Sequence, residues 1–198
     1  MRLIADNLAC ERNGREIFRE ISFSVRSGDY LELRGPNGSG KSSLLRLVAG
    51  LLPIARGSLK LEGGNGDQPL QQHCHYSGHQ DAVKSALTVR ENASFWARMY
   101  GSVEDDVALS EFSLLGLADH HAQILSAGQR RRLALTRLVL SPRSIWLLDE
   151  PATALDATHR EKLAALAVAH LARGGMVIAA THGDWGLKPV LQLTLGEA

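Results

Sequence analysis

The chain has 198 residues, of which 44% are hydrophobic and 22% are charged, and its formal net charge is +1. These values are typical of one globular domain with a hydrophobic core. The small net charge argues against nucleic acid or an anionic membrane surface as a partner, and two cysteines, Cys10 and Cys74, are too few for a disulfide framework.

No targeting or membrane-spanning segment is evident. The opening residues, MRLIADNLACERNG, contain no long apolar run of the kind found in a secretory signal. No stretch approaches the roughly 20 apolar residues that cross a bilayer. We therefore expect a chain in the cytoplasm, with no direct membrane insertion, that works at a membrane only through a partner.

Alternating apolar and polar residues, as in IFREISFSV, predict antiparallel strands with one face in water near the N-terminus. A short strand then leads into a glycine-rich loop, and the helix after this loop ends near Gly50 and Pro53. The elements expected in this half are strands over 2–9, 16–26, 28–35 and 57–63, a helix over 41–52, and a loop over 63–69.

Within a single domain over 1–198, the apolar spacing becomes helical from residue 81, and we expect a helical sub-domain over 81–136. Thr88 and Glu91 form a capping-box sequence at the start of one of its helices. Two later apolar runs predict strands of a parallel sheet covered on both faces. The elements expected in this half are helices over 88–101, 106–118, 126–138 and 158–175, and strands over 144–149 and 176–181.

Residues 35–42, GPNGSGKS, match the pattern G-x-x-x-x-G-K-S of a phosphate-binding loop, and an expected strand and helix flank them. The glycines let backbone N–H groups turn toward phosphate oxygens. Lys41 would reach the β- and γ-phosphates, and the Ser42 hydroxyl would bind Mg²⁺. The residues expected to hold the nucleotide here are Gly35, Pro36, Asn37, Gly38, Ser39, Gly40, Lys41, Ser42 and Ser43.

A pair of carboxylates follows the apolar strand IWLLD. Asp149 would hold Mg²⁺, and Glu150 would orient or deprotonate the attacking water, a contribution of about 10²–10⁴ in rate for a general base. Alone, such a pair is equally well explained as a solvated strand end. Beside a phosphate loop, it predicts a site that hydrolyses a nucleotide.

A second candidate anion site lies at the start of the helix expected over 126–138. Ser126 and Gln129 form a capping box, and the free N–H groups at a helix start attract anions. Leucines supply an apolar stripe, with Arg130–Arg132 and Arg137 expected on wetter faces. An ordinary capped helix is the alternative reading of the same residues.

Several motifs in this order resemble those of the ABC-type ATPases. LSAGQ (125–129) is similar to their signature motif, Gln80 to the Q-loop glutamine, ALD (154–156) to the D-loop, and His182 to the switch histidine. The resemblance spans nearly the whole chain. It implies an α/β fold of the phosphate-loop NTPase type, with a parallel sheet, an antiparallel β arm and the inserted helical sub-domain.

The resemblance also implies that two copies pair head to tail with two ATP molecules at their interface. Ser126, Gly128 and Gln129 of one copy would then face the γ-phosphate held by the other. Asp156 would meet the other copy's phosphate loop, although an acid at this position also suits the start of the following helix. Hydrolysis would let the dimer open.

Glu150, His182 and Gln80 are the catalytic residues that the resemblance implies. His182 would hydrogen-bond the γ-phosphate and hold Glu150, whereas a lone histidine is otherwise structural. Gln80 would touch Mg²⁺ or the attacking water, whereas a lone loop glutamine is otherwise inert. The implied ligands of Mg²⁺ are Ser42, Gln80 and Asp149.

Arg12 departs from the family pattern. It occupies the position where an aromatic ring usually stacks on adenine, and an arginine plane can stack on a base by cation–π contact. We therefore expect Arg12 to contact the base and a broader tolerance for other purines.

Within the family, residues 76–101, 125–138 and 145–156 look like those of the ATP-binding subunits of the cytochrome c maturation system, or heme exporter ATPases. This implies a peripheral ATPase at the cytoplasmic face of the bacterial inner membrane, bound to integral membrane permease subunits. The alternative functions are the ATPase subunit of another small exporter and a soluble ABC switch protein. A small-molecule kinase is disfavoured, because it would not need the LSAGQ motif.

The resemblance places a groove for the permease subunit just after Gln80. Leu87, Val89, Phe95, Trp96, Met99 and Tyr100 follow, and local core accounts for most of them. We expect the loop over 81–88, and not the aromatic side chains, to make the contact.

The segment HCHYSGHQ (73–80) contains three histidines and a cysteine, which are residue types that bind metal or heme, but its pattern does not favour such a site. In a strand, His73 and His75 face one way and Cys74 the other. No C-x-x-C-H attachment motif is present. A buried or edge strand explains the segment, and a solvated turn explains His120 and His121.

Overall fold

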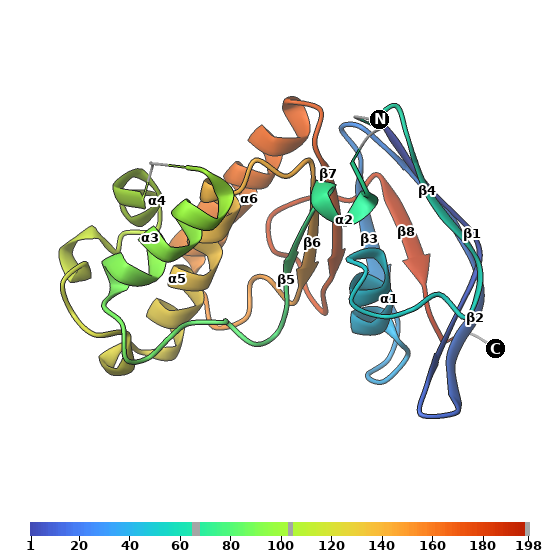
Figure 1. Cartoon of the computed structure of the whole chain (residues 1–198), viewed down its shortest axis with the longest axis horizontal. Helices are drawn as coiled ribbons and strands as arrows, with labels where there is room; N and C mark the ends of the chain where they lie inside the picture. Colours follow the sequence, from blue (N-terminus) through green and yellow to red (C-terminus); the bar gives the residue numbers. More distant parts are fainter. Residues whose placement is uncertain (65–67, 103–104, 197–198) are drawn as a thin grey trace. The chain divides into compact units, whose positions relative to one another are not determined.

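Five parallel strands form the central sheet of the computed structural model (Figure 1). Their order is β5-β6-β7-β3-β8, and every neighbouring pair is parallel. The strands are β3 (Tyr30–Arg34), β5 (Cys74–Ser77), β6 (Ile145–Asp149), β7 (Met176–Ala180) and β8 (Leu191–Thr194). The sheet confirms the expected β3, β6 and β7, and Cys74–Ser77 of the histidine-containing segment form an edge strand. The expectation that His73 shares a strand face with His75 is wrong, because His73 ends the short helix before β5. The sequence did not predict β8, because LQLT is short and half polar.

A separate antiparallel sheet contains β1 (Arg2–Arg12), β2 (Arg15–Arg26) and β4 (Arg56–Glu62) in the order β2-β1-β4. The β1–β2 hairpin turns at Asn13 and Gly14, which both have positive φ, as a two-residue hairpin loop requires. This sheet confirms the expected antiparallel arm.

Helix α1 (Lys41–Val48) lies between the two sheets (Figure 1). Its buried side chains, Leu44, Leu45, Leu47 and Val48, share one hydrophobic core with residues of β1, β3, β6 and β7. A short helix, α2 (Leu70–His73), precedes β5. Because α1 packs against both sheets, the end of the loop that precedes it is held in a fixed position.

The described residues are 1–64, 68–102 and 105–196, so residues 65–67 of the expected loop over 63–69 lie outside them. The chain divides into two compact units. Unit 1, which contains both sheets, comprises Met1–Gly78, Arg143–Pro151 and Leu166–Ala198, and unit 2 comprises His79–Pro142 and Ala152–Ala165. Helix α6 (Ala157–Ala172) begins in unit 2 and ends in unit 1.

Unit 2 is helical. Helices α3 (Val89–Tyr100), α4 (Asp105–Glu111) and α5 (Ala127–Leu140) pack around Ala97, Ala108 and Leu140, and short 3₁₀ turns cover Leu115–Leu117 and Ala122–Ile124. Both expected capping boxes are present, at the starts of α3 and α5. Hydrogen bonds from Thr88 lower the pKa of Glu91, as expected for a carboxylate at a helix start.

Two expectations about unit 2 are wrong. The helix expected over 106–118 ends at Glu111, because Ser113 takes a φ of 55° that an α-helix cannot contain. Arg131 lies on a face that the sequence predicts to be wetter, yet it is buried, because its guanidinium pairs with the carboxylate of Asp81 at 3.0 Å. A charged side chain can be buried when such a partner is present.

Within residues 1–64, 68–102 and 105–196, every helix is too short or too polar to cross a bilayer.

Candidate nucleotide site

The loop between β3 and α1 has the backbone that phosphate binding requires. Gly35, Gly38 and Gly40 all have positive φ, and Gly40, at 99°, is the residue on which α1 begins. A Cβ built at Gly35 would collide with the backbone oxygen of Leu195. Only glycine therefore fits the first position of the loop without displacing the end of β8.

Lys41 lies inside this loop. It is buried, and its ammonium donates hydrogen bonds to the backbone oxygens of Gly35 at 2.7 Å and Pro36 at 2.9 Å. The Ser39 hydroxyl is also buried and has no hydrogen-bond partner. The loop therefore offers a buried cation and a hydroxyl without a partner. Both suit a phosphate group, which accepts hydrogen bonds on several oxygens. Pro36, Asn37 and Gly38 are exposed, and Ser43 is half-buried.

The hydroxyl of Ser42 meets the carboxylate of Asp149 at the ends of α1 and β6 that face the loop. Ser42 Oγ donates to Asp149 Oδ1 at 2.9 Å, and Tyr76 Oη lies 3.4 Å from Asp149 Oδ2. Burial raises the pKa of Tyr76, so its phenol stays neutral. Hydroxyl and carboxylate oxygens are the ligands that Mg²⁺ prefers, and Ser42 and Asp149 therefore fit this ion.

Glu150 follows Asp149 in a conformation that turns the chain out of the sheet. Its φ is 50°, and its N–H donates to the backbone oxygen of Ala180 at the end of β7. Glu150 Oε1 lies 3.6 Å from Nε2 of His182. His182 follows β7 in the chain. The structure thus brings the predicted catalytic pair, Glu150 and His182, together.

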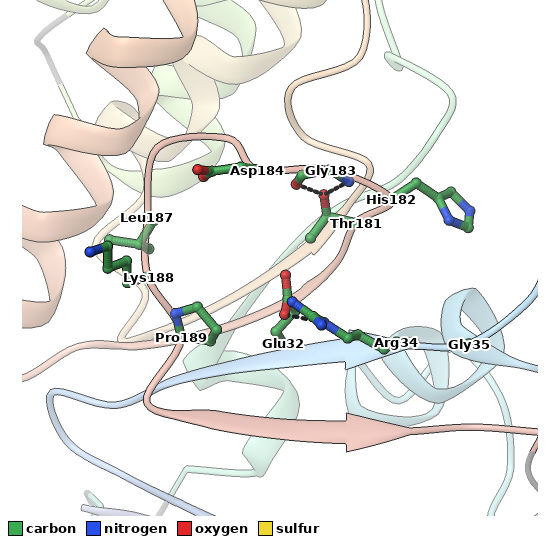
Figure 2. A pocket seen from close by; sticks show the side chains of 10 residues that line it. All are labelled: Glu32, Arg34, Gly35, Thr181, His182, Gly183, Asp184, Leu187, Lys188 and Pro189. Carbon is green, nitrogen blue, oxygen red and sulfur yellow. Dashed lines mark hydrogen bonds and ion pairs between the residues drawn. The ribbon is translucent and has the colours of Figure 1, made fainter.

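A polar cavity of about 500 Å³ adjoins Gly35 and His182 (Figure 2). The buried carboxylate of Glu32 accepts hydrogen bonds there from Arg34 at 2.6 Å and from Gln192 at 3.2 Å. Figure 2 shows the ring of His182 pointing away from this ion pair. The charges of Glu32 and Arg34 therefore offset each other within the cavity.

Unit 2 contains the predicted trans-acting residues. Ser126 Oγ accepts from the Gln129 N–H at 3.2 Å, and Gln129 Oε1 accepts from the Ser126 N–H at 2.9 Å. Because Ser126 Oγ only accepts in this box, its O–H remains able to donate to an anion. A Cβ built at Gly128 would lie 2.9 Å from the backbone oxygen of Ala154, so a glycine is needed where the 154–156 segment approaches α5.

Asp156 caps the start of α6. Its Oδ1 accepts a hydrogen bond from the backbone N–H of His159 at 2.9 Å. The alternative interpretation of Asp156, as an acid that suits the start of a helix, therefore also agrees with the structure. The carboxylate is 67% exposed. Capping and contact with a second copy can therefore coexist at Asp156.

Two further predicted residues, Gln80 and Arg12, are exposed. Gln80 is exposed in the bend after β5 and belongs to unit 2, whereas the phosphate loop belongs to unit 1. Arg12 is exposed at the end of β1, directly before the hairpin turn. Their roles toward the nucleotide stay predictions.

The histidines near Cys74 lie in and around β5. His75 is buried in β5, and burial raises the pKa of the Cys74 thiol to about 12. Among the described residues, there is no group of three or more His, Cys, Asp or Glu side chains that could hold a metal ion.

Comparison with known proteins decides the family. Residues 18–153 match the family model described as "ABC transporter". The chain belongs to the ABC transporter family. The α/β fold with its parallel and antiparallel sheets and the resemblance to ABC-type ATPases are thereby confirmed, and an ABC ATP-binding domain implies nucleotide binding and ATPase activity.

Among curated ABC proteins, several relatives match the chain over its length. The cytochrome c biogenesis ATP-binding export protein CcmA of Nitrobacter winogradskyi is 50% identical over 100% of both chains. Proteins of the same name from Bradyrhizobium diazoefficiens and Brucella abortus are 49% and 43% identical, over 94% of both chains and over 98% and 91% of the two chains, respectively.

Solved structures agree with the ABC fold. An ABC transporter ATP-binding protein from Pyrococcus furiosus has a TM-score of 0.83 and 22% identity over 98% of both chains. The ATP-binding subunit of an ABC transporter has a TM-score of 0.80 and 23% identity over 92% of this chain and 80% of the other. At these identities, the likeness concerns the fold alone.

The structure adds two side chains that sequence reasoning missed in this ABC chain. Tyr76 lies against Asp149, and Arg46 Nε donates to Tyr76 Oη at 3.2 Å. The available signal was that Tyr76 belongs to a strand before Gln80. Nothing in the sequence showed that this strand pairs with β6 and so places Tyr76 beside Asp149.

Proposed function

We propose that this chain hydrolyses ATP as the subunit of a membrane ABC transporter complex that serves c-type cytochrome biogenesis through heme export. The observation that carries the ATPase function is the meeting of Ser42 with Asp149 and of Glu150 with His182 at one end of the parallel sheet. Relatives named as cytochrome c biogenesis export proteins, 43–50% identical over nearly full length, support the cellular role.

The residues of the phosphate loop bind and orient the triphosphate. Lys41 exchanges its hydrogen bonds with the carbonyls of Gly35 and Pro36 for phosphate oxygens, so no buried charge loses its partners. The N–H groups at the start of α1 add the favourable end of a helix dipole. This cradle lowers the cost of gathering negative charge around the γ-phosphate.

Glu150 and His182 act at the far side of the γ-phosphate. The Glu150 carboxylate orients the attacking water and accepts its proton. His182 Nε2, 3.6 Å from Glu150 Oε1, limits where that carboxylate can point and contacts the γ-phosphate. The resemblance to ABC-type ATPases assigns Gln80 to the same water or to Mg²⁺.

Ser42 and Asp149, with Gln80, would hold Mg²⁺. When bound, the ion offsets charge on the β- and γ-phosphates. The Tyr76 phenol, kept neutral by burial, helps to fix the orientation of the Asp149 carboxylate.

Two copies assemble head to tail around two ATP molecules. Ser126 and Gly128, with Gln129 holding the capping box, present the start of α5 to the γ-phosphate of the other copy. Asp156 faces the other copy's phosphate loop. The chain works as a single ABC domain over 1–198, with the helical sub-domain over 81–136.

A groove in unit 2 is the docking site for the permease subunit. Its volume is about 660 Å³, and it is lined by Leu87, Arg90, Glu91, Ser94, Phe95, Arg98 and Met99. Of the six hydrophobic residues considered from sequence, only Val89 is fully buried, while Met99 is 63% exposed. The buried Asn92 holds the adjoining loop by hydrogen bonds to Lys84 and Thr88. The groove thus joins the expected 81–88 contact loop to the exposed face of α3.

Affinity purification tests the cellular role. The Glu150→Gln chain, expressed in a bacterium with a cytochrome c maturation system, is isolated with ATP from detergent-solubilised membranes. Multi-span membrane proteins together with heme-handling subunits are expected at the inner membrane. A different permease would remove heme export, and recovery only from the soluble fraction would favour a soluble ABC switch.

Replacing Met99 by glutamate is expected to lower this recovery of membrane proteins about tenfold, the effect of losing one well-packed interface residue. Hydrolysis by the isolated chain should stay within twofold of the parent. Val107→Glu is the matched control, because Val107 is 58% exposed on α4 and does not line the groove. Equal recovery of the two variants would exclude the groove as the docking site.

Replacing Arg12 by alanine is expected to weaken nucleotide binding about fivefold, since an exposed cation–π contact contributes about 1 kcal/mol. Titration with ATP, GTP and inosine triphosphate measures this loss and the breadth of base recognition. Arg15→Ala, across the same hairpin turn, is the control. Unchanged affinity in Arg12→Ala would show that Arg12 does not contact the base.

A further inference from the structure

His159 links two segments of unit 2 that the proposed function assigns to the dimer interface. Its Nδ1 lies 2.7 Å from Asp156 Oδ1, and its Nε2 lies 3.0 Å from Arg132 Nη1. The imidazole is only 12% exposed. One ring therefore joins the 154–156 segment to α5, the helix that begins at Ser126.

The two contacts select one form of the ring. A guanidinium has donors and no acceptor, so Nε2 must accept the hydrogen bond from Arg132. The Asp156 carboxylate is an acceptor, so Nδ1 carries the proton and donates to it. His159 is thus a neutral imidazole protonated at Nδ1.

The result is a fixed carboxylate at Asp156. Its Oδ1 accepts from both the backbone N–H and the ring of His159, at 2.9 and 2.7 Å. These hydrogen bonds lower the pKa of Asp156. With one oxygen held twice and the side chain 67% exposed, the carboxylate can present its other oxygen to a partner in a fixed direction.

Arg132 extends the link to the rest of unit 2. The same Nη1 also donates to the backbone oxygen of Phe112 at 2.8 Å, at the end of α4. One turn along α6, Lys162 Nζ donates to Ser113 Oγ at 3.1 Å. The start of α6 is therefore fastened to both α4 and α5 by side chains.

We propose that His159 is a positioning residue, which with Arg132 locks Asp156 to the signature helix α5 so that both reach the second copy as one body. The proposal rests on the proposed function, because Asp156 and Ser126 matter together only if ATP is bound between two copies. Close packing of Gly128 against the Ala154 carbonyl supports it independently of the ring.

Dimerisation measured by sedimentation with Mg-ATP tests the proposal in the full Glu150→Gln chain. His159→Ala should raise the dimer dissociation constant about tenfold, as expected for losing one charge-assisted hydrogen bond. The ATP affinity of the monomer should stay within twofold, because the phosphate loop belongs to unit 1. His120→Ala, at an exposed histidine of unit 2, is the matched control.

A double-mutant cycle separates positioning from stabilisation. In an Asp156→Ala background, His159→Ala should change the dimer dissociation constant by less than twofold, since the residue it positions is gone. A tenfold loss that persists in that background, or an equal loss of ATP affinity in the monomer, would overturn the proposal.

Nitrogen-15 NMR of the wild-type chain gives a test that needs neither a variant's stability nor ATP. The His159 ring should show a proton on Nδ1 and a bare Nε2 at neutral pH. A proton on Nε2 would contradict the link to Arg132. If the parent chain fails to dimerise with ATP, the proposed function fails, while the state of the ring still decides the link.

Discussion

Replacing Glu150 by glutamine is expected to lower kcat for ATP hydrolysis by about 10²–10⁴, the usual contribution of a general base. Binding of ATP should be retained, because Lys41 and the loop glycines lie on a different segment and the amide keeps the shape of the carboxylate. The Glu150 N–H still donates to Ala180, so the unusual backbone at this position is preserved.

Two measurements check this result. Phosphate release gives kcat, and sedimentation with ATP shows whether the variant accumulates as a dimer that cannot open. Glu62→Gln, at an exposed glutamate of unit 1, is the control and should hydrolyse ATP at the parent rate. A Glu150→Gln chain with more than half of the parent kcat would remove Glu150 from the chemical step.

Features whose signals lie within a few residues of each other are predictable from the sequence. The capping boxes of Thr88 and Ser126 depend on a partner three residues away, and both are present. The phosphate loop likewise needs only its own eight residues and two flanking elements. Such patterns are predictable because the groups that satisfy them are close in the chain.

Features that depend on distant partners were not predictable. Arg131 is buried because Asp81, 50 residues earlier, supplies a carboxylate. Tyr76 reaches Asp149 only because β5 pairs with β6, and β8 is a strand only because β3 offers it an open edge. The sequence states which groups are polar, but the pairing of the strands decides which of them meet.

Backbone conformation at the site also escaped sequence reasoning. Glu150 and Ala154 have φ values of 50° and 63°, although neither is glycine. Residues other than glycine rarely adopt a positive φ, so the sequence DEPATALD does not predict this backbone conformation. Both residues stand at bends, one directing a carboxylate out of the sheet and the other turning its carbonyl toward Gly128. Backbone strain of this kind is most common at functional sites.

The first glycine of the phosphate loop is where backbone geometry has its largest expected effect on stability. At Gly35, φ is 134°, and an added Cβ would collide with the backbone oxygen of Leu195. The Leu195 N–H donates to Arg34 at 2.9 Å, so relieving the collision pulls the end of β8 from β3. We expect Gly35→Ala to lower the free energy of unfolding by about 3 kcal/mol, from strain and overpacking together.

Gly38→Ala is the matched control for Gly35→Ala, because it changes the same loop where a Cβ meets nothing within 4 Å. It retains only the cost of a positive φ, about 1 kcal/mol. Urea denaturation compares the two, and titration of ATP should show a loss of more than about 10²-fold for Gly35→Ala, equivalent to about 3 kcal/mol. Equal stability of the two variants would mean that the loop can leave its contact with β8 freely. The comparison therefore measures the close approach of Leu195 together with the larger φ of Gly35, 134° against 84° at Gly38.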